Sequence, residues 1–100
     1  MKTKVRTFRV WTYDVWGNAR DGFDVNDRYY LGRVSIRCKR ETFNVGTPNE
    51  FSTWEPTDRQ LSRAAGFTGV KWDGTGDGYY TAEVSRNGRP VGELIEEETA

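Results

Sequence analysis

The chain has 100 residues, enough for one domain with a single modest hydrophobic core. Its 15 basic and 15 acidic side chains cancel, which excludes a strong overall field that would recruit nucleic acid or membrane. One cysteine and no histidine exclude an internal disulfide, the usual structural zinc sites and the His-based catalytic groupings. We therefore expect one domain over residues 1–100 that binds rather than catalyses, with no cofactor and no metal.

The N-terminal segment is charged and lacks an apolar stretch, and no apolar run in the chain approaches the length of a membrane span. These features predict a soluble protein without a secretory leader.

Charge is unevenly distributed along the chain. Residues 1–40 contain ten Lys and Arg against four Asp, a net of +6, and residues 41–100 contain five against eleven acidic residues, a net of −6. Segregated halves would give the molecule a basic and an acidic side, whereas a sheet that mixes strands of both halves would pair the charges. We favour mixing, because strands from both halves are expected in one sheet.

Residues 5–16 are rich in β-branched and aromatic side chains and contain no Gly or Pro, which predicts a strand. Both faces of this strand would be apolar, so it is either central and covered or interrupted by a bulge. The turn dipeptides Gly17-Asn18 and Asp21-Gly22 predict a short loop after it. Alternation places Val5, Trp11, Tyr13 and Val15 on one face and Phe8, Val10 and Trp16 on the other.

A second strand is predicted over residues 29–40. Val34, Ile36 and Cys38 alternate with Arg33, Ser35, Arg37 and Lys39, which makes Cys38 a core thiol rather than a nucleophile. Residues 41–56 allow two interpretations. They form either two short strands, at 42–45 and 51–54, around a turn at 47–49, or an ordered loop.

One short helix is predicted after Thr57. Thr57 and Gln60 have the spacing of a capping box. Asp58 would place a negative charge at the N-terminal end of the helix, where the helix dipole is positive. Leu61, Ala64 and Ala65 form the apolar stripe, Gly66 occupies the expected left-handed C-cap, and Phe67 follows to contact the last turn. A helix this short is stable only when it packs on a sheet.

The remainder of the chain is predicted to form three strands, at residues 70–72, 79–86 and 89–95. A loop at 73–78 joins the first two, and a type I′ turn at Asn87-Gly88 joins the last two. Pro90 must lie on an edge strand or be the first residue of its strand. We expect residues 95–100 to fray. The fold class predicted is α+β: an antiparallel sheet of four to six strands with one short helix packed on one face.

The loop at 73–78 partly matches a calcium-binding loop, with Asp at its first and fifth positions and Gly at its sixth. Its third position is Thr75, and Glu83 comes one residue before the closing position. We interpret this segment as a Gly- and Asp-rich turn, with a weak calcium site as the alternative.

The segment 11–27 concentrates aromatic and aspartate side chains. Its aspartates could hold a tight turn, its aromatics could anchor a partner protein, or its carboxylates could bind a cation or act in acid–base chemistry. Four Trp exceed what so small a core readily hides, which favours an exposed surface. The predicted partner-binding residues are Trp11, Tyr13, Trp16, Asn18, Asp21 and Phe23.

A basic stripe suggests an alternative function, single-stranded nucleic-acid binding. Arg33, Arg37, Lys39 and Arg40 could follow a phosphate backbone while nearby aromatics stack on bases. The competing interpretation is a solvated sheet face beside strands that carry Glu83 or Glu93.

Residues 11–18, 21–23 and 25–27, together with 79–84 and 88–94, resemble segments of small uncharacterised accessory proteins of tailed bacteriophages and prophages. The similarity covers less than half of the chain. It implies a small protein in the cytoplasm of a bacterial host, of a kind that often binds a host or defence-system protein, and it implies no particular activity.

Overall fold

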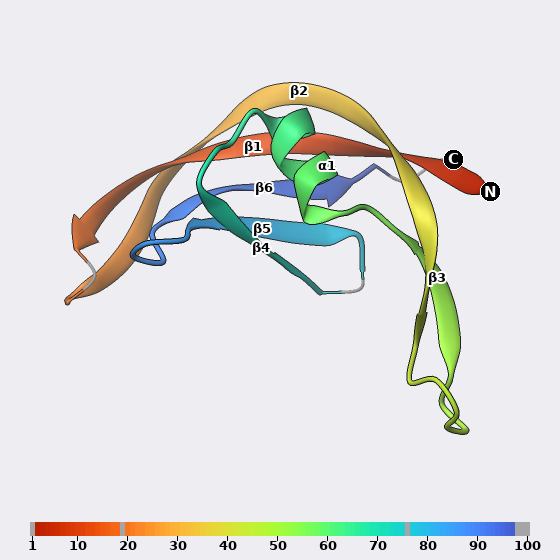
Figure 1. Ribbon diagram of the computed structural model, residues 1–100. Helices are drawn as coiled ribbons and strands as arrows, with labels where there is room; N and C mark the ends of the chain where they lie inside the picture. Colours follow the sequence, from red (N-terminus) through yellow and green to blue (C-terminus); the bar gives the residue numbers. More distant parts are fainter. Residues whose placement is uncertain (1, 19, 76, 98–100) are drawn as a thin grey trace.

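The computed structural model describes residues 2–18, 20–75 and 77–97. It contains one antiparallel sheet of six strands in the order β3-β2-β1-β6-β5-β4 and one short helix on one face (Figure 1). The α+β fold class predicted from the sequence is confirmed. The elements are β1 (Thr3–Asn18), β2 (Gly22–Phe43), β3 (Phe51–Glu55), α1 (Asp58–Ala65), β4 (Val70–Gly74), β5 (Tyr79–Val84) and β6 (Pro90–Glu96).

The two longest strands, β1 and β2, pair along the whole of β1, whereas β6 pairs with β1 only from Phe8 to Thr12. Residues 13–18 and 22–28 therefore extend beyond the sheet as a two-stranded projecting hairpin. Outside the β1–β2 pairing, Arg89 also contributes a hydrogen bond from its side chain to the Val15 carbonyl, at 2.9 Å. Two-stranded hairpins are marginally stable by themselves, so this element depends on the sheet at its base.

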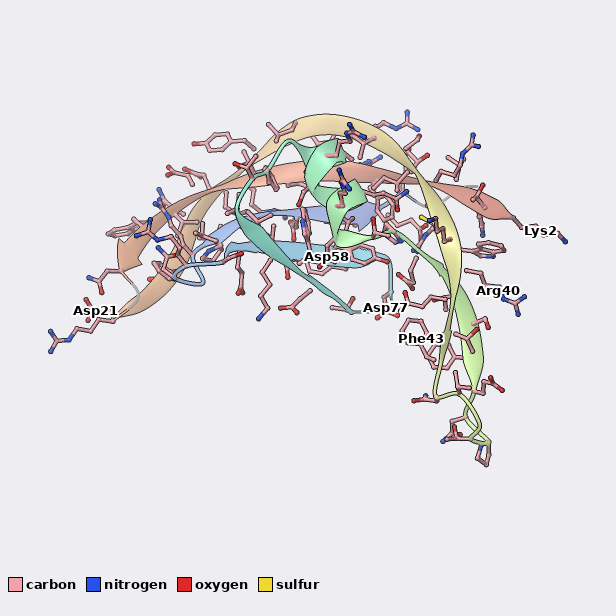
Figure 2. The ribbon with its side chains drawn as sticks, in the orientation of Figure 1. Lys2, Asp21, Arg40, Phe43, Asp58 and Asp77 are labelled. Atoms are coloured by element: carbon pink, nitrogen blue, oxygen red, sulfur yellow. The ribbon has the colours of Figure 1, made fainter. Side chains whose placement is uncertain are left out.

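At its other end, β2 pairs with β3 through residues 39–43. The segment 41–56, for which the sequence allowed two interpretations, thus forms strand pairing around a turn at residues 44–50: its first strand is the end of β2, which stops at Phe43, and its second is β3. In Figure 1 this arm and the projecting hairpin bend to the same side at opposite ends of the molecule, which gives it the shape of an arch. Figure 2 shows Asp21 at one end of the arch and Phe43 on the other arm.

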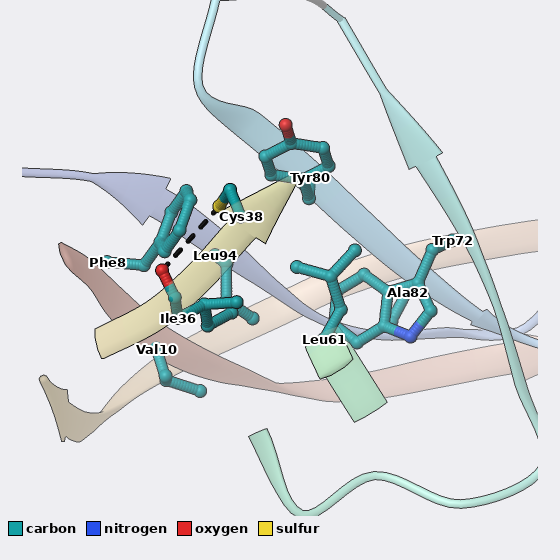
Figure 3. Packing of buried hydrophobic residues seen from close by; sticks show 9 residues of the cluster. All are labelled: Phe8, Val10, Ile36, Cys38, Leu61, Trp72, Tyr80, Ala82 and Leu94. Carbon is teal, nitrogen blue, oxygen red and sulfur yellow. Dashed lines mark hydrogen bonds between the residues drawn. The ribbon is translucent and has the colours of Figure 1, made fainter. Parts of the chain in front are cut away.

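The hydrophobic core lies between α1 and one face of the sheet. Leu61 of the helix packs against residues of five strands, and all of them are buried (Figure 3). Cys38 is fully buried, as predicted, and its thiol donates a long hydrogen bond to the Ile36 carbonyl. The core cluster comprises Phe8, Val10, Ile36, Cys38, Leu61, Trp72, Tyr80, Ala82 and Leu94.

The helix follows its predicted pattern. Thr57 Oγ1 accepts a hydrogen bond from the Gln60 backbone N–H, and Gln60 Oε1 accepts one from the Thr57 N–H, so the capping box is complete. Gly66 ends the helix with a left-handed φ of 76°. Trp72 Nε1 donates to Ser62 Oγ at 2.8 Å and ties the helix to β4.

The hairpin between β5 and β6 differs from the prediction. Its loop spans residues 85–88, because the Val84 N–H bonds to the Arg89 carbonyl, and only Gly88 has a positive φ. The type I′ turn at Asn87-Gly88 and a strand continuing to Arg86 were therefore wrong predictions. Pro90 is the first residue of β6, one of the two positions predicted for it.

The expected frayed tail was also wrong in part. Ile95 and Glu96 belong to β6, and the Glu97 N–H donates to the Thr7 carbonyl at 2.9 Å. Residues 98–100 lie outside the described part of the chain. Among the described residues, α1 is far too short and polar to cross a membrane.

Charges from the two halves of the chain are mixed, as predicted. β1 lies between β2 and β6 in the sheet, and the ion pairs join basic residues before position 40 to acidic residues after position 54. These pairs are Arg6–Glu55, Arg6–Glu96, Arg9–Glu97, Arg28–Glu93 and Arg33–Glu97.

Candidate functional site

Two bulges in β2 decide which side chains meet on each face. Val10 pairs with Gly32 and Trp11 with Tyr30, so Leu31 is an extra, unpaired residue in β2. Asn26 is a second extra residue, because Asp14 pairs with Asp27 and Val15 with Val25. The first bulge reverses the alternation of β2. Odd-numbered residues from Arg33 onward lie on the same face as the even-numbered Tyr30.

The face of the sheet opposite α1 is not covered by the helix, and we call it the open face. β1 contributes Arg9, Trp11 and Tyr13 to it, and the strand registers place aromatic and charged partners beside them. The side chains that this register brings to the open face from the other strands are Arg28, Tyr30, Arg33, Arg37, Lys39, Tyr79 and Glu93.

At the centre of the open face, Glu93 is only 3 % exposed. Its carboxylate accepts a hydrogen bond from the Tyr79 hydroxyl and forms an ion pair with Arg28. Burial raises the pKa of Tyr13, and the neighbouring Tyr79 hydroxyl and Glu93 carboxylate raise it further. Both tyrosines therefore stay neutral donors, and the Tyr79 hydroxyl and the Arg28 guanidinium compensate the buried carboxylate.

Beside this cluster, Trp11 lies between two β2 side chains. The Arg28 guanidinium is 4.6 Å from the centre of the Trp11 ring, and the Tyr30 ring centre is 5.1 Å away at an interplanar angle of 51°. Trp11 is half-buried by these contacts, while Tyr30 keeps 49 % of its surface exposed.

Next to this aromatic pair is a shallow hollow of about 340 Å³ lined by Arg9, Trp11, Tyr30, Arg33 and Glu97. Arg9 and Arg33 are opposite each other in the β1–β2 register, and both guanidinium groups are directed to Glu97. Of the predicted basic stripe, Arg33, Arg37 and Lys39 share the open face. Arg40 alternates to the other side of β2, opposite Trp54.

The predicted partner-binding residues do not form one surface. Trp11 and Tyr13 lie on the open face, whereas Trp16 points to the other side of β1 and is 66 % exposed near the tip of the projecting hairpin. Trp16 is opposite Asp24, and Asp14 opposite Asp27 is the next pair on that side. Phe23, opposite Gly17, is half-buried.

Asn18 and Asp21 are exposed and hold the turn of this hairpin. Asn18 Oδ1 accepts hydrogen bonds from the Arg20 and Asp21 N–H groups, each at 3.0 Å, and its Nδ2 donates to Asp21 Oδ2 at 3.0 Å. These bonds match the turn interpretation of the aspartates.

No group of three or more His, Cys, Asp or Glu side chains within residues 2–18, 20–75 and 77–97 is arranged to hold a metal ion. Asp73 and Gly74 belong to β4, so the loop predicted to begin at Asp73 begins later. Gly76, the middle glycine of the calcium-like segment, lies outside the described residues.

Sequence reasoning missed Arg9, Arg28, Tyr30 and Glu97 as open-face residues. Arg9 follows from simple alternation with Trp11 in β1. Tyr30 and Arg28 follow only once the bulge is known, and its signal in the sequence is Gly32, a glycine inside a strand, here with φ 127°. No known protein family, curated protein or solved structure shows a match to this chain.

Proposed function

We propose that this protein is a non-enzymatic binding protein that recognises a partner protein through its projecting hairpin. The observation that carries the proposal is the location of the large apolar side chains that are exposed to solvent. Exposed large apolar residues concentrate on this hairpin and at its base, at Trp16, Val25, Tyr29, Tyr30 and Leu31. Several exposed large apolar side chains gathered on and beside a marginally stable hairpin are typical of an interaction surface.

The surroundings of Trp16 define the chemistry of the partner. Asp14, Asp24 and Asp27 lie on the same side of the hairpin as Trp16. A tryptophan among carboxylates fits an apolar pocket rimmed by Lys or Arg, where the ring supplies affinity and the charges accelerate association. The resemblance to phage accessory proteins supports a host or defence-system protein as this partner.

Affinity capture from bacterial lysate with the Trp16→Ala variant tests the proposal. We expect the variant to lose the partners retained by the wild type, and added salt to weaken wild-type capture. Phe51→Ala is the matched control, because Phe51 is an exposed aromatic on the opposite arm, stacked on Phe43. Equal capture by a folded Trp16→Ala variant would refute this surface.

A second candidate function is single-stranded nucleic-acid binding across the open face. The observation that favours it is the register, which gathers Arg33, Arg37 and Lys39 with Trp11 and Tyr30 on the uncovered side of the sheet. Basic side chains would contact phosphates while exposed rings stack on bases. Gel shifts with single-stranded oligonucleotides at low salt test this function, and the lack of any complex would eliminate it.

A further inference from the structure

The hollow on the open face is built around one carboxylate and two guanidinium groups. Glu97 Oε2 lies 2.6 Å from Arg33 Nε, and Glu97 Oε1 lies 3.9 Å from Arg9 Nη2. More than half of each arginine side chain is exposed, whereas Glu97 is mostly covered. One negative charge therefore faces two positive charges at the mouth of the hollow.

The Glu97 carboxylate is incompletely hydrogen-bonded in this position. Its Oε2 atom is buried and close to the Arg33 guanidinium, yet within the described residues it accepts no hydrogen bond. Neither Arg9 nor Arg33 donates a side-chain hydrogen bond to any other described residue. A buried carboxylate oxygen without a hydrogen bond is costly, and guanidinium donors that remain unused are available to a better-shaped acceptor.

A phosphate matches these donors better than the carboxylate does. Its oxygens are arranged tetrahedrally and can accept from two guanidinium groups at once, whereas Glu97 makes one close contact and one at 3.9 Å. The Tyr30 ring lies at the edge of the same hollow with about half of its surface exposed, where a base attached to that phosphate can stack.

We infer that Arg9 and Arg33 form a phosphate-binding site for single-stranded nucleic acid, and that the Glu97 carboxylate occupies this site in the unbound protein as an internal competitor. The inference rests on the second candidate function and deepens it. Binding exchanges Glu97 for a backbone phosphate of the strand, while Tyr30 stacks on an adjacent base. The duplex is disfavoured because its bases are already stacked and paired.

Fluorescence anisotropy of a labelled oligothymidylate of about 10 nucleotides tests the inference. Removing the competing charge with Glu97→Gln is expected to tighten binding by about tenfold at low salt. The Arg9→Ala/Arg33→Ala double variant is expected to weaken binding and to reduce the slope of log affinity against log salt by about 0.7, the value for one lost phosphate contact on a single strand. Arg59→Ala/Arg63→Ala, which removes two exposed charges from α1, is the matched control and is expected to keep the wild-type slope.

The outcomes separate the inference from the function beneath it. If the wild type binds the strand but Glu97→Gln binds no more tightly, Glu97 is not a competitor and the inference is wrong, while nucleic-acid binding stands. If no variant binds, both are wrong. Displacement of the strand by millimolar inorganic phosphate, beyond the effect of ionic strength, would show a general anion site and overturn the assignment to nucleic acid.

Discussion

Arg6 connects three strands at the edge of the core. Its guanidinium pairs with Glu96 of β6, donates to the Trp54 carbonyl of β3, and lies 3.9 Å from Glu55. Tyr80 donates its hydroxyl to the same Glu55, and burial, reinforced by this carboxylate, raises the pKa of Tyr80. A single arginine therefore holds the β3 arm and the last strand together.

The Arg6–Glu96 pair predicts a dependence of stability on pH. The hydrogen bond and charge of Arg6 hold the pKa of Glu96 below its ordinary value of 4.5. A lowered pKa stabilises the fold above pH 4.5, and this contribution is lost as the pH falls through the folded-state pKa. Glu96→Gln should therefore be less stable than the wild type near pH 7, by about 0.5–1 kcal/mol since Glu96 is partly exposed, and the difference should shrink toward pH 3.

Thermal unfolding at several pH values measures this difference. Glu50→Gln is the control, because Glu50 is exposed and forms no ion pair within the described residues. A gap between wild type and Glu96→Gln that stays constant from pH 7 to pH 3 would contradict the assignment.

At the scale of elements, α1 shows how a helix of eight residues is kept in place. Its capping box satisfies the first turn, Leu61 inserts into the core, and Gln60 Nε2 donates to the Arg37 carbonyl of β2 at 2.7 Å. The Gln60 side chain thus completes the capping box through its oxygen and bonds the helix to β2 through its nitrogen. One side chain therefore links the helix cap to the packing of the helix on the sheet.

Thr57→Ala is expected to destabilise the protein by about 1 kcal/mol, because the Gln60 N–H loses its acceptor at the helix N-terminus. Urea unfolding measures the change. Thr57→Ser keeps the hydroxyl and should stay within a few tenths of a kcal/mol of the wild type. Equal losses in both variants would show that the methyl group, and not the cap, matters at this position.

The elements differ in how far the sequence determines them. Local signals were enough for α1, because its caps and apolar stripe lie within ten residues, and for the clean alternation of residues 33–39. They failed at Asn87-Gly88, where the loop closes through Val84 and Arg89. They also failed on the open face, where Trp11, Tyr30 and Glu93 come from three strands and the bulge at Leu31 sets the register.

At the scale of the whole molecule, the core lies on one side of the sheet only. The open face is stabilised instead by paired charges and contacts between aromatic rings, such as Glu93 with Arg28 and Trp11 with Tyr30.

The reactivity of Cys38 measures whether the core is closed, because Cys38 is fully buried and burial raises the pKa of its thiol.

Cys38 is therefore expected to react with a thiol reagent such as DTNB at pH 8 only through global unfolding. Labelling in native buffer should be slow, and it should become rapid and stoichiometric in urea. The single cysteine makes the absorbance signal unambiguous. Fast stoichiometric labelling of the native protein would show that the helix and the β3 arm open independently of the rest.

The bulge at Leu31 has a consequence for how this chain tolerates changes in length. Deleting Leu31 would remove the extra residue, so alternation would become regular while Tyr30 stays beside Trp11. Deleting Tyr30 instead, with the bulge kept, would place Tyr29 beside Trp11 and exchange the sides of the β2 residues between the two bulges. Deleting one residue of the turn at 44–50 changes only a connection. Insertions and deletions between residues 26 and 32 are thus the changes by which this fold could acquire a different surface without altering its core.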